Sequence, residues 1–174
     1  MLGDVVVRPV RADEYEAVGE LTVAAYTTID GFAPGERYQG VLRDVAGRTE
    51  TAEVIVAADG DGRIVGGVTF VPGLGPLAEF EGADESGMRM LAVDPAAQGR
   101  GVGAALLGHV VGATRRLGFA GVVCSSQPAM RAAHRVYDRF GFRRDPTRDW
   151  SPEPGIELIA FALRLGPSRR DGTR

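Results

Sequence analysis

The stretch from Leu91 to Leu107, "LAVDPAAQGRGVGAALL", most constrains the fold, because an apolar run passes through a glycine-rich turn into a helical pattern. Gly99, Gly101 and Gly103 all lie in that turn. The first N–H groups of a helix have no partner inside the helix, and glycine lets a ligand approach the backbone without a Cβ in the way. We therefore predict an anion-binding site at the start of this helix.

Strand-like and helix-like patterns alternate along the 174 residues. The expected strands cover residues 4–10, 52–59, 63–72, 86–93, 119–126, 142–145 and 155–165, and the expected helices cover residues 12–29, 37–48, 101–118 and 128–141. This order predicts one mixed α/β domain over residues 1–165, with a mostly antiparallel central sheet of about six or seven strands and about four flanking helices. We expect residues 166–174 to be a disordered tail.

Composition excludes several classes of function. The net charge of −3 indicates neither nucleic acid nor an anionic membrane as a partner. No apolar run approaches the roughly 18–20 residues of a membrane span. The single cysteine, Cys124, excludes an internal disulfide and fits a reducing cytoplasm. His109 and His134 belong to different predicted helices, and no cluster has the ligand spacing of a metal site, so we expect no metal.

Three interpretations of the glycine-rich loop compete. A P-loop needs a lysine, and the chain has none. The segment "GRGVGA" matches the dinucleotide fingerprint, but the acidic residue expected about 20 residues later is missing from "VVCSS". A tight turn without any ligand is the simplest alternative, because short glycine motifs are weak signals.

A wider match comes from two motifs together. The segment "QGRGVG", preceded by "RMLAVDP", resembles motif A of the GNAT superfamily of N-acetyltransferases. The segment "AAHRVYDRFGF" resembles motif B of the same family, a helix with a tyrosine before Gly-Phe. The order of strands and helices also matches the family up to about Leu165. Two motifs about 30 residues apart are more specific than either one alone.

The resemblance implies acetyl-CoA as the donor co-substrate. Its pyrophosphate would lie on backbone N–H groups of the loop. The strand before the loop would separate from the next strand, so that its end pairs with the pantetheine arm. The residues implied to bind acetyl-CoA are Leu91, Ala92, Val93, Gln98, Gly99, Arg100, Gly101, Val102, Gly103 and Ala104. Met130 stands where the family often has asparagine, which leaves the pantetheine contacts of that region open.

The resemblance also implies two catalytic residues. Tyr137 would protonate the leaving CoA thiolate, because a phenol with a pKa near 10 matches a thiolate of similar basicity. A core role for Tyr137 is the alternative, since Ala133 and Phe140 share its helix face. An amine acceptor must lose a proton, and Glu85 fits best as the general base. Its acidic loop is equally consistent with a solvated segment or with attraction of a cationic amine.

We therefore predict an acetyl-CoA-dependent N-acetyltransferase that transfers acetyl to a primary amine by direct attack in a ternary complex. The acceptor is a small-molecule amine or an amine of a peptide or protein. Phe32, Tyr38 and Trp150 are candidate walls of its pocket. The alternative is a non-catalytic GNAT-like domain that binds acyl-CoA. The resemblance also favours a homodimer.

Overall fold

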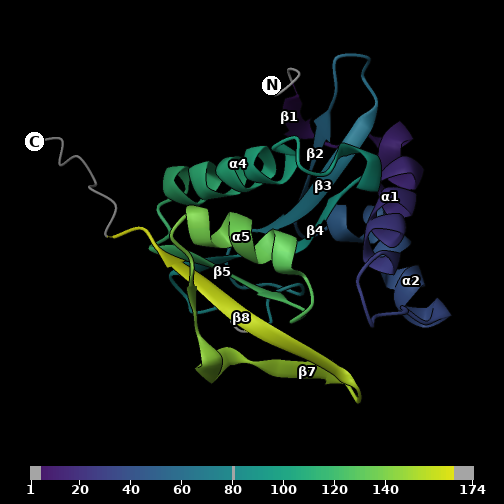
Figure 1. The fold of residues 1–174 in the computed structure, drawn as a ribbon. Helices are drawn as coiled ribbons and strands as arrows, with labels where there is room; N and C mark the ends of the chain where they lie inside the picture. The colour runs from purple at the N-terminus through teal and green to yellow at the C-terminus, as the bar shows by residue number, and fades with distance from the viewer. Residues whose placement is uncertain (1–4, 80, 167–174) are drawn as a thin grey trace, which may run out of the picture.

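The computed structural model describes residues 5–79 and 81–166 (Figure 1). The strands are β1 (Val6–Pro9), β2 (Glu53–Ala58), β3 (Ile64–Val71), β4 (Glu85–Val93), β5 (Gly121–Ser126), β6 (Arg143–Arg144), β7 (Trp150–Glu153) and β8 (Ile156–Arg164). The α-helices are α1 (Tyr15–Thr27), α2 (Glu36–Arg43), α3 (Val45–Thr49), α4 (Val102–Arg116) and α5 (Arg131–Arg139). The predicted mixed α/β class is confirmed. The expected tail lies outside the described residues except for Gly166.

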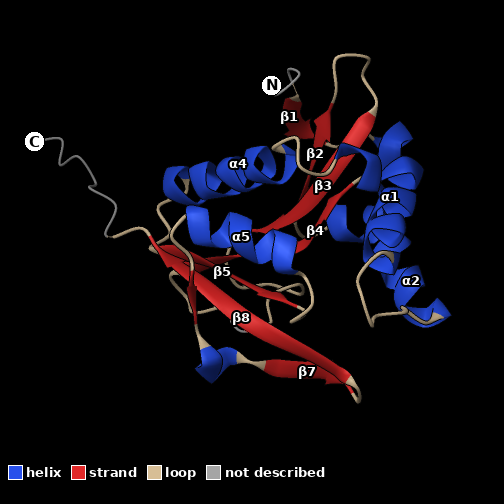
Figure 2. Ribbon diagram, viewed as in Figure 1, coloured by secondary structure: helices blue, strands red, loops and turns tan. Residues whose placement is uncertain are grey.

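One sheet runs through the molecule, with the strand order β1-β2-β3-β4-β5-β8-β6 and with β7 paired to β8 (Figure 2). Within the described residues, every pairing is antiparallel except that between β4 and β5. This confirms the prediction of a mostly antiparallel sheet. The single parallel pair forms because α4 connects β4 to β5 and returns the chain to the same end of the sheet.

The alternation of side chains along β2 explains why helices cover both faces of the sheet. Ile55 belongs to the largest apolar cluster, together with Leu106 of α4. Its neighbour Val54 points to the opposite face, where it packs with Val18 of α1 and Val45 of α3. Apolar residues at successive positions therefore serve two cores, one under α4 and α5 and the other under α1 to α3.

Two local features differ from the prediction. The expected helix over residues 37–48 is divided at Asp44, whose backbone leaves the helical region and whose side chain accepts a hydrogen bond from the Gly47 N–H. Asp44 thereby ends α2 and caps α3. Strand β7 was not predicted, because the prolines around Trp150 indicate a loop. It forms as the first arm of a hairpin that turns at Gly155, where φ is +88°.

Strands β4 and β5 are paired along only half of β4. The pairing runs from Glu85–Gly121 to Met88–Cys124 and then stops, although β4 continues to Val93. Beyond this point β4 stays paired to β3 through an irregular register. Met90 has a φ of +52°, the only positive value of a non-glycine residue in the described part of the chain. The two strands therefore separate, as the family resemblance implies.

The beginning of β4 is held by a buried ion pair. Arg148 Nη1 donates to Glu85 Oε2 at 2.6 Å, and the Gly82 N–H donates to the same oxygen at 2.8 Å. The Glu85 side chain is 2 % exposed. Burial alone would raise the pKa of Glu85, but the hydrogen bonds from Arg148 and Gly82 hold it below its ordinary value. Glu85 thus fastens the segment before β7 to the central sheet.

We expect Glu85→Gln to lower the free energy of unfolding by about 2 kcal/mol at pH 7, because it leaves Arg148 without its buried partner. A group with a lowered folded pKa stabilises the fold above its unfolded pKa, about 4.3 for glutamate, and this contribution is lost as the pH falls through the folded value. Urea unfolding at pH 7 and pH 3 measures the difference. Glu157→Gln, at an exposed position of β8, is the control. Equal effects of the two substitutions would contradict the assignment.

Candidate active site

The glycine-rich loop forms a cradle of free N–H groups, as its sequence predicts. Gly99 and Gly101 have φ values of +76° and +83°, which glycine adopts without strain. Gly101 is the N-cap of α4, and the first backbone hydrogen bond of the helix runs from the Ala105 N–H to the Gly101 oxygen. Among the described residues, the N–H groups from Gln98 to Ala104 have no acceptor. Such a cradle at a helix N-terminus fits an anionic group.

This cradle forms one wall of the main cavity, which has a volume of about 1240 Å³. The other walls are the C-terminal end of α1, the end of β4 and the helix α5. The structure brings together here all ten residues predicted to bind the cofactor, Leu91, Ala92, Val93, Gln98, Gly99, Arg100, Gly101, Val102, Gly103 and Ala104. The other edge of β4 is paired to β3 at these positions, with Ala92 opposite Gly67. The edge facing the cavity is therefore available to an extended ligand.

A small pocket adjoins the main cavity where β4 and β5 separate. Its lining consists of Tyr26, Met88, Arg89, Met90, Leu91, Ser125, Met130 and Tyr137. Tyr26, Leu91 and Met130 line both spaces. The predicted acid Tyr137 and the residue that replaces the usual asparagine, Met130, thus lie together at the end of the main cavity.

Tyr137 lies in the core, as its helix face predicts, and it also lines the small pocket; its role as an acid stays a prediction. Its ring packs between Phe142 and Phe161, with centroid distances of 5.6 Å and 5.3 Å, and the residue is 2 % exposed. The same side chain lines the small pocket. Burial raises the pKa of the Tyr137 phenol well above its ordinary value, and a hydrogen bond with the Cys124 thiol adds to this effect. The phenol is therefore protonated at neutral pH and available as a donor.

The structure does not bring Glu85, the predicted base, to this site. Glu85 lines neither space, because its carboxylate is held by Arg148 at the opposite end of β4. Six residues of strand, about 20 Å, separate it from Leu91. A shared strand face does not bring the two residues close, because this distance lies along the strand. This geometry argues against Glu85 as the base.

Two other carboxylates lie next to the small pocket. Arg89, which lines it, forms ion pairs with Glu79, at 3.0 Å between Nε and Oε2, and with Glu81. The Glu81 side chain is fully buried, whereas that of Glu79 is 29 % exposed. Burial raises the pKa of Glu79, partly offset by Arg89. The sequence signal for this cluster was the charged Arg89 inside the apolar run "GMRMLAV", since a buried arginine requires a partner.

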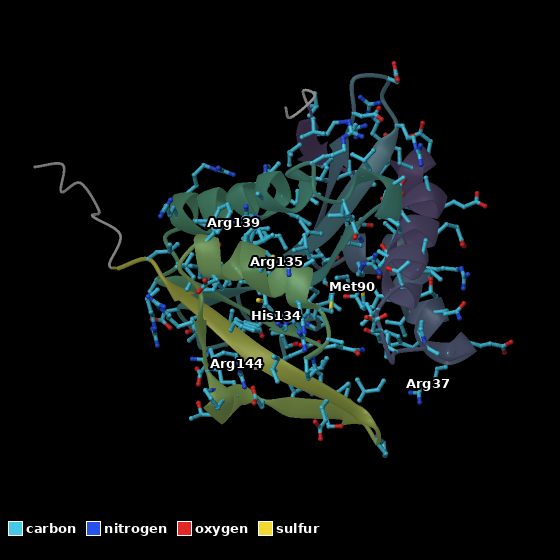
Figure 3. All side chains as sticks on the ribbon, in the orientation of Figure 1. Arg37, Met90, His134, Arg135, Arg139 and Arg144 are labelled. Carbon is cyan, nitrogen blue, oxygen red and sulfur yellow. The ribbon has the colours of Figure 1, made fainter. Side chains whose placement is uncertain are left out.

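The predicted acceptor walls are only partly brought together. Phe32 and Tyr38 form an aromatic cluster with Tyr26, at centroid distances between 5.9 and 6.5 Å. Tyr26 also lines the small pocket, which connects this cluster to the site. Trp150 instead lies on β7, opposite Leu158. The sequence analysis also missed a row of arginines on α5, of which Figure 3 labels Arg135 and Arg139.

Residues 5–79 and 81–166 contain no group of three or more histidine, cysteine, aspartate or glutamate side chains that could hold a metal ion. Within the same residues, no helix has the length and apolar character needed to cross a membrane.

Comparison with solved structures shows the same fold in several acetyltransferases. A GNAT-family acetyltransferase from Staphylococcus aureus Mu50 has a TM-score of 0.76 at 14 % identity, covering 93 % of this chain and 99 % of the other. The ribosomal-protein-S18-alanine N-acetyltransferase of Escherichia coli has a TM-score of 0.68 at 17 % identity, covering 98 % of this chain and 100 % of the other. A GNAT-family acetyltransferase from Brucella melitensis, in complex with acetyl-CoA, has a TM-score of 0.62 at 22 % identity, covering 95 % of this chain and 91 % of the other.

No curated protein matches the sequence significantly. The family pattern described as "Acetyltransferase (GNAT) family" matches residues 15–142, which include β4, the N–H cradle and α5. This match extends over most of the chain and contains both motifs on which the resemblance rests. The protein therefore belongs to the GNAT acetyltransferase family.

Proposed function

We propose that the protein is an acetyl-CoA-dependent N-acetyltransferase that transfers acetyl to a primary amine by direct attack in a ternary complex. The observation that carries this proposal is the main cavity, where the free edge of β4 meets the N–H cradle of residues 98–104. The acetyl-CoA complex of the Brucella melitensis relative supports the choice of cofactor. The acceptor is a small amine or an amine of a peptide or protein. A cytoplasmic location and a homodimer stay predictions.

The main cavity and the adjoining small pocket offer a chemical counterpart to each part of acetyl-CoA. The N–H groups from Gln98 to Ala104 would bind the pyrophosphate. The backbone of Leu91 to Val93 would pair with the amides of the pantetheine arm, as an added strand would. The thioester would then reach the small pocket beside Tyr137. When bound, the cofactor supplies an activated acetyl group, and the protein orients it.

Tyr137 is the proposed general acid. When the amine nitrogen attacks the thioester carbonyl, the carbon–sulfur bond breaks and the CoA thiolate takes up a proton. The buried phenol is protonated at neutral pH and lines the small pocket toward which the thioester would point. Cys124 is an unsuitable nucleophile, because burial raises the pKa of its thiol to about 12. Direct attack by the amine needs no covalent enzyme intermediate.

Glu79 is the proposed general base, in place of Glu85. The Glu79 carboxylate forms an ion pair with Arg89, and Arg89 lines the small pocket. The raised pKa of Glu79 brings it closer to neutrality, where a base accepts a proton most effectively. Its partial exposure allows the proton to leave to water. Glu81 is fully buried, so we assign it the role of holding Arg89.

The proposal predicts that CoA thiol is released from acetyl-CoA in the presence of at least one member of a panel of small amines and peptides. Gly101→Leu should remove this activity and the thermal stabilisation by acetyl-CoA, because a side chain there is strained and obstructs the N–H cradle. Thiol detection and thermal unfolding measure the two effects.

Gly118→Leu is the matched control for Gly101→Leu. Gly118 ends α4 with a φ of +78°, so the substitution imposes similar strain, about 1–2 kcal/mol, away from the cavity. Equal loss of stabilisation by acetyl-CoA in both variants would contradict the cradle. Stabilisation by acetyl-CoA without turnover on any amine would instead support the non-catalytic acyl-CoA-binding domain.

Tyr137→Phe should lower kcat by about 100-fold and change the KM for acetyl-CoA little. The substitution keeps the ring that packs against Phe142 and Phe161 and removes only the proton donor. Steady-state kinetics and calorimetric binding of acetyl-CoA separate the two effects. A parallel decrease in affinity and turnover would indicate that Tyr137 acts through packing.

Glu79→Gln should lower kcat by about 100-fold and remove the rise of kcat with pH that deprotonation of Glu79 causes in the wild type. The active form of the base is the carboxylate, so activity increases as the pH rises through its raised pKa. Measuring kcat as a function of pH shows whether this increase is present. Asp84→Asn, at an exposed carboxylate of the same loop, should leave the profile unchanged. A wild-type profile in Glu79→Gln would overturn the assignment.

A further inference from the structure

The methionines of the chain gather at the small pocket. Met88 and Met90 belong to β4, Met130 is the N-cap of α5, and all three line this pocket. The only other methionine in the sequence is Met1. The pocket adjoins the main cavity where β4 and β5 separate, and Tyr137 forms another part of its wall. Flexible thioether side chains therefore lie at the place toward which the proposed thioester would point.

The irregularity in β4 brings these side chains to the pocket from both faces of the sheet. Met88 belongs to the core under α4 and α5 and is 1 % exposed. Met90, two positions later, would lie on the same face of a regular strand. With its φ of +52°, it packs instead against the cluster of Tyr26 and Ala92, on the side of α1. Figure 3 shows Met90 between α5 and α1. The pocket is therefore closed by the fixed Met88 and by the half-buried Met90 and Met130.

The size of the small pocket limits what it holds without a change in its wall. Its volume is about 10 Å³. A space of this size holds about one water-sized group, such as the methyl of an acetyl group. A longer acyl chain has to displace part of the wall. Tyr26, Met88 and Tyr137 are at most 8 % exposed and closely packed, so Met90 and Met130 are the parts that can move.

A methionine wall yields at little cost. The side chain is unbranched, has three rotatable bonds and fits irregular spaces. Burial of one more methylene favours binding by about fourfold, whereas a side chain pushed partly off its rotamer costs about two- to tenfold. These effects nearly cancel, whereas overpacking against a rigid wall costs about five- to a hundredfold. Met130 also borders the main cavity, which gives it space to move.

We propose that the protein also transfers acyl groups longer than acetyl, namely propionyl and butyryl, because the methionines of the small pocket adapt to them. This inference rests on the proposed function, in which the thioester reaches that pocket. The reaction is unchanged. The amine nitrogen forms a bond to the acyl carbon and loses a proton, the carbon–sulfur bond breaks, and the CoA thiolate takes up a proton.

Steady-state kinetics with acetyl-CoA, propionyl-CoA and butyryl-CoA tests the proposal, with an amine that supports turnover. We expect kcat/KM of the wild type for propionyl-CoA to lie within about tenfold of that for acetyl-CoA, whereas a rigid apolar pocket discriminates by about 10–200-fold per methylene. Met130→Ile has a similar volume but a stiff χ1, so the ratio of propionyl to acetyl transfer should decrease by at least about tenfold. Met130→Ala enlarges the pocket and should raise the ratio of butyryl to acetyl transfer.

Leu163→Ile is the matched control, since Leu163 is half-buried on β8 and lines neither the small pocket nor the main cavity. It should leave the preference among the three donors unchanged. A wild-type kcat/KM for propionyl-CoA more than about tenfold below that for acetyl-CoA would overturn the proposal. The same ratios in the wild type and in both Met130 variants would overturn it as well.

Calorimetric binding distinguishes a failure of this inference from a failure of the proposed function. If no amine supports turnover, the proposed function fails, but the affinities for the three acyl-CoA compounds still test the pocket. Affinities for acetyl-CoA and propionyl-CoA within about tenfold of each other, with a weaker relative binding of propionyl-CoA by Met130→Ile, would support the adaptable pocket. Binding of acetyl-CoA more than about tenfold tighter than that of propionyl-CoA by the wild type would contradict it.

Discussion

The early end of the pairing between β4 and β5 is the constraint on which the site depends. Only four residues of each strand are paired, up to Met88 and Cys124. If the pairing continued to Val93, the backbone of β4 would be saturated on both edges and could bind no extended ligand. The α4 connection then places its N–H groups at the end of this free edge, so that one separation of strands provides both a backbone edge and an anion cradle.

Opposite charges lie on the two sides of β4. Met88 points into the core under α4 and α5, where the N–H cradle and the α5 arginines favour an anion. Gly87 points to the other face, and a Cβ on it would overlap the Glu81 carboxylate. Glu79, Glu81 and Arg89 together carry a net charge of −1 on that face. The two sides of β4 therefore favour groups of opposite charge.

The sequence alone predicted those features that depend only on neighbouring residues. Periodicity located most strands and helices, and the glycines at positions 99 and 101 identified the cradle, because only backbone conformation matters there. It was insufficient where partners come from distant segments. The sequence favours Glu85 over Glu79 and Glu81 only by its place next to the strand, and the fold shows that Arg148 holds Glu85 while Arg89 holds the other two. The arginines of α5 likewise appear to be ordinary surface residues until α4 is placed beside them.

The position of Tyr137 in the core bears on its proposed role as a proton donor. A phenol on the surface would sample several rotamers and exchange hydrogen bonds with water, whereas contacts with Phe142 and Phe161 hold this ring in one orientation. Preorganised donors cost no reorganisation when negative charge develops, and they act more strongly where water is excluded. The burial that raises the pKa of Tyr137 keeps the phenol protonated at neutral pH. The same burial therefore fixes the ring in the core and would hold the proton that the proposed transfer needs.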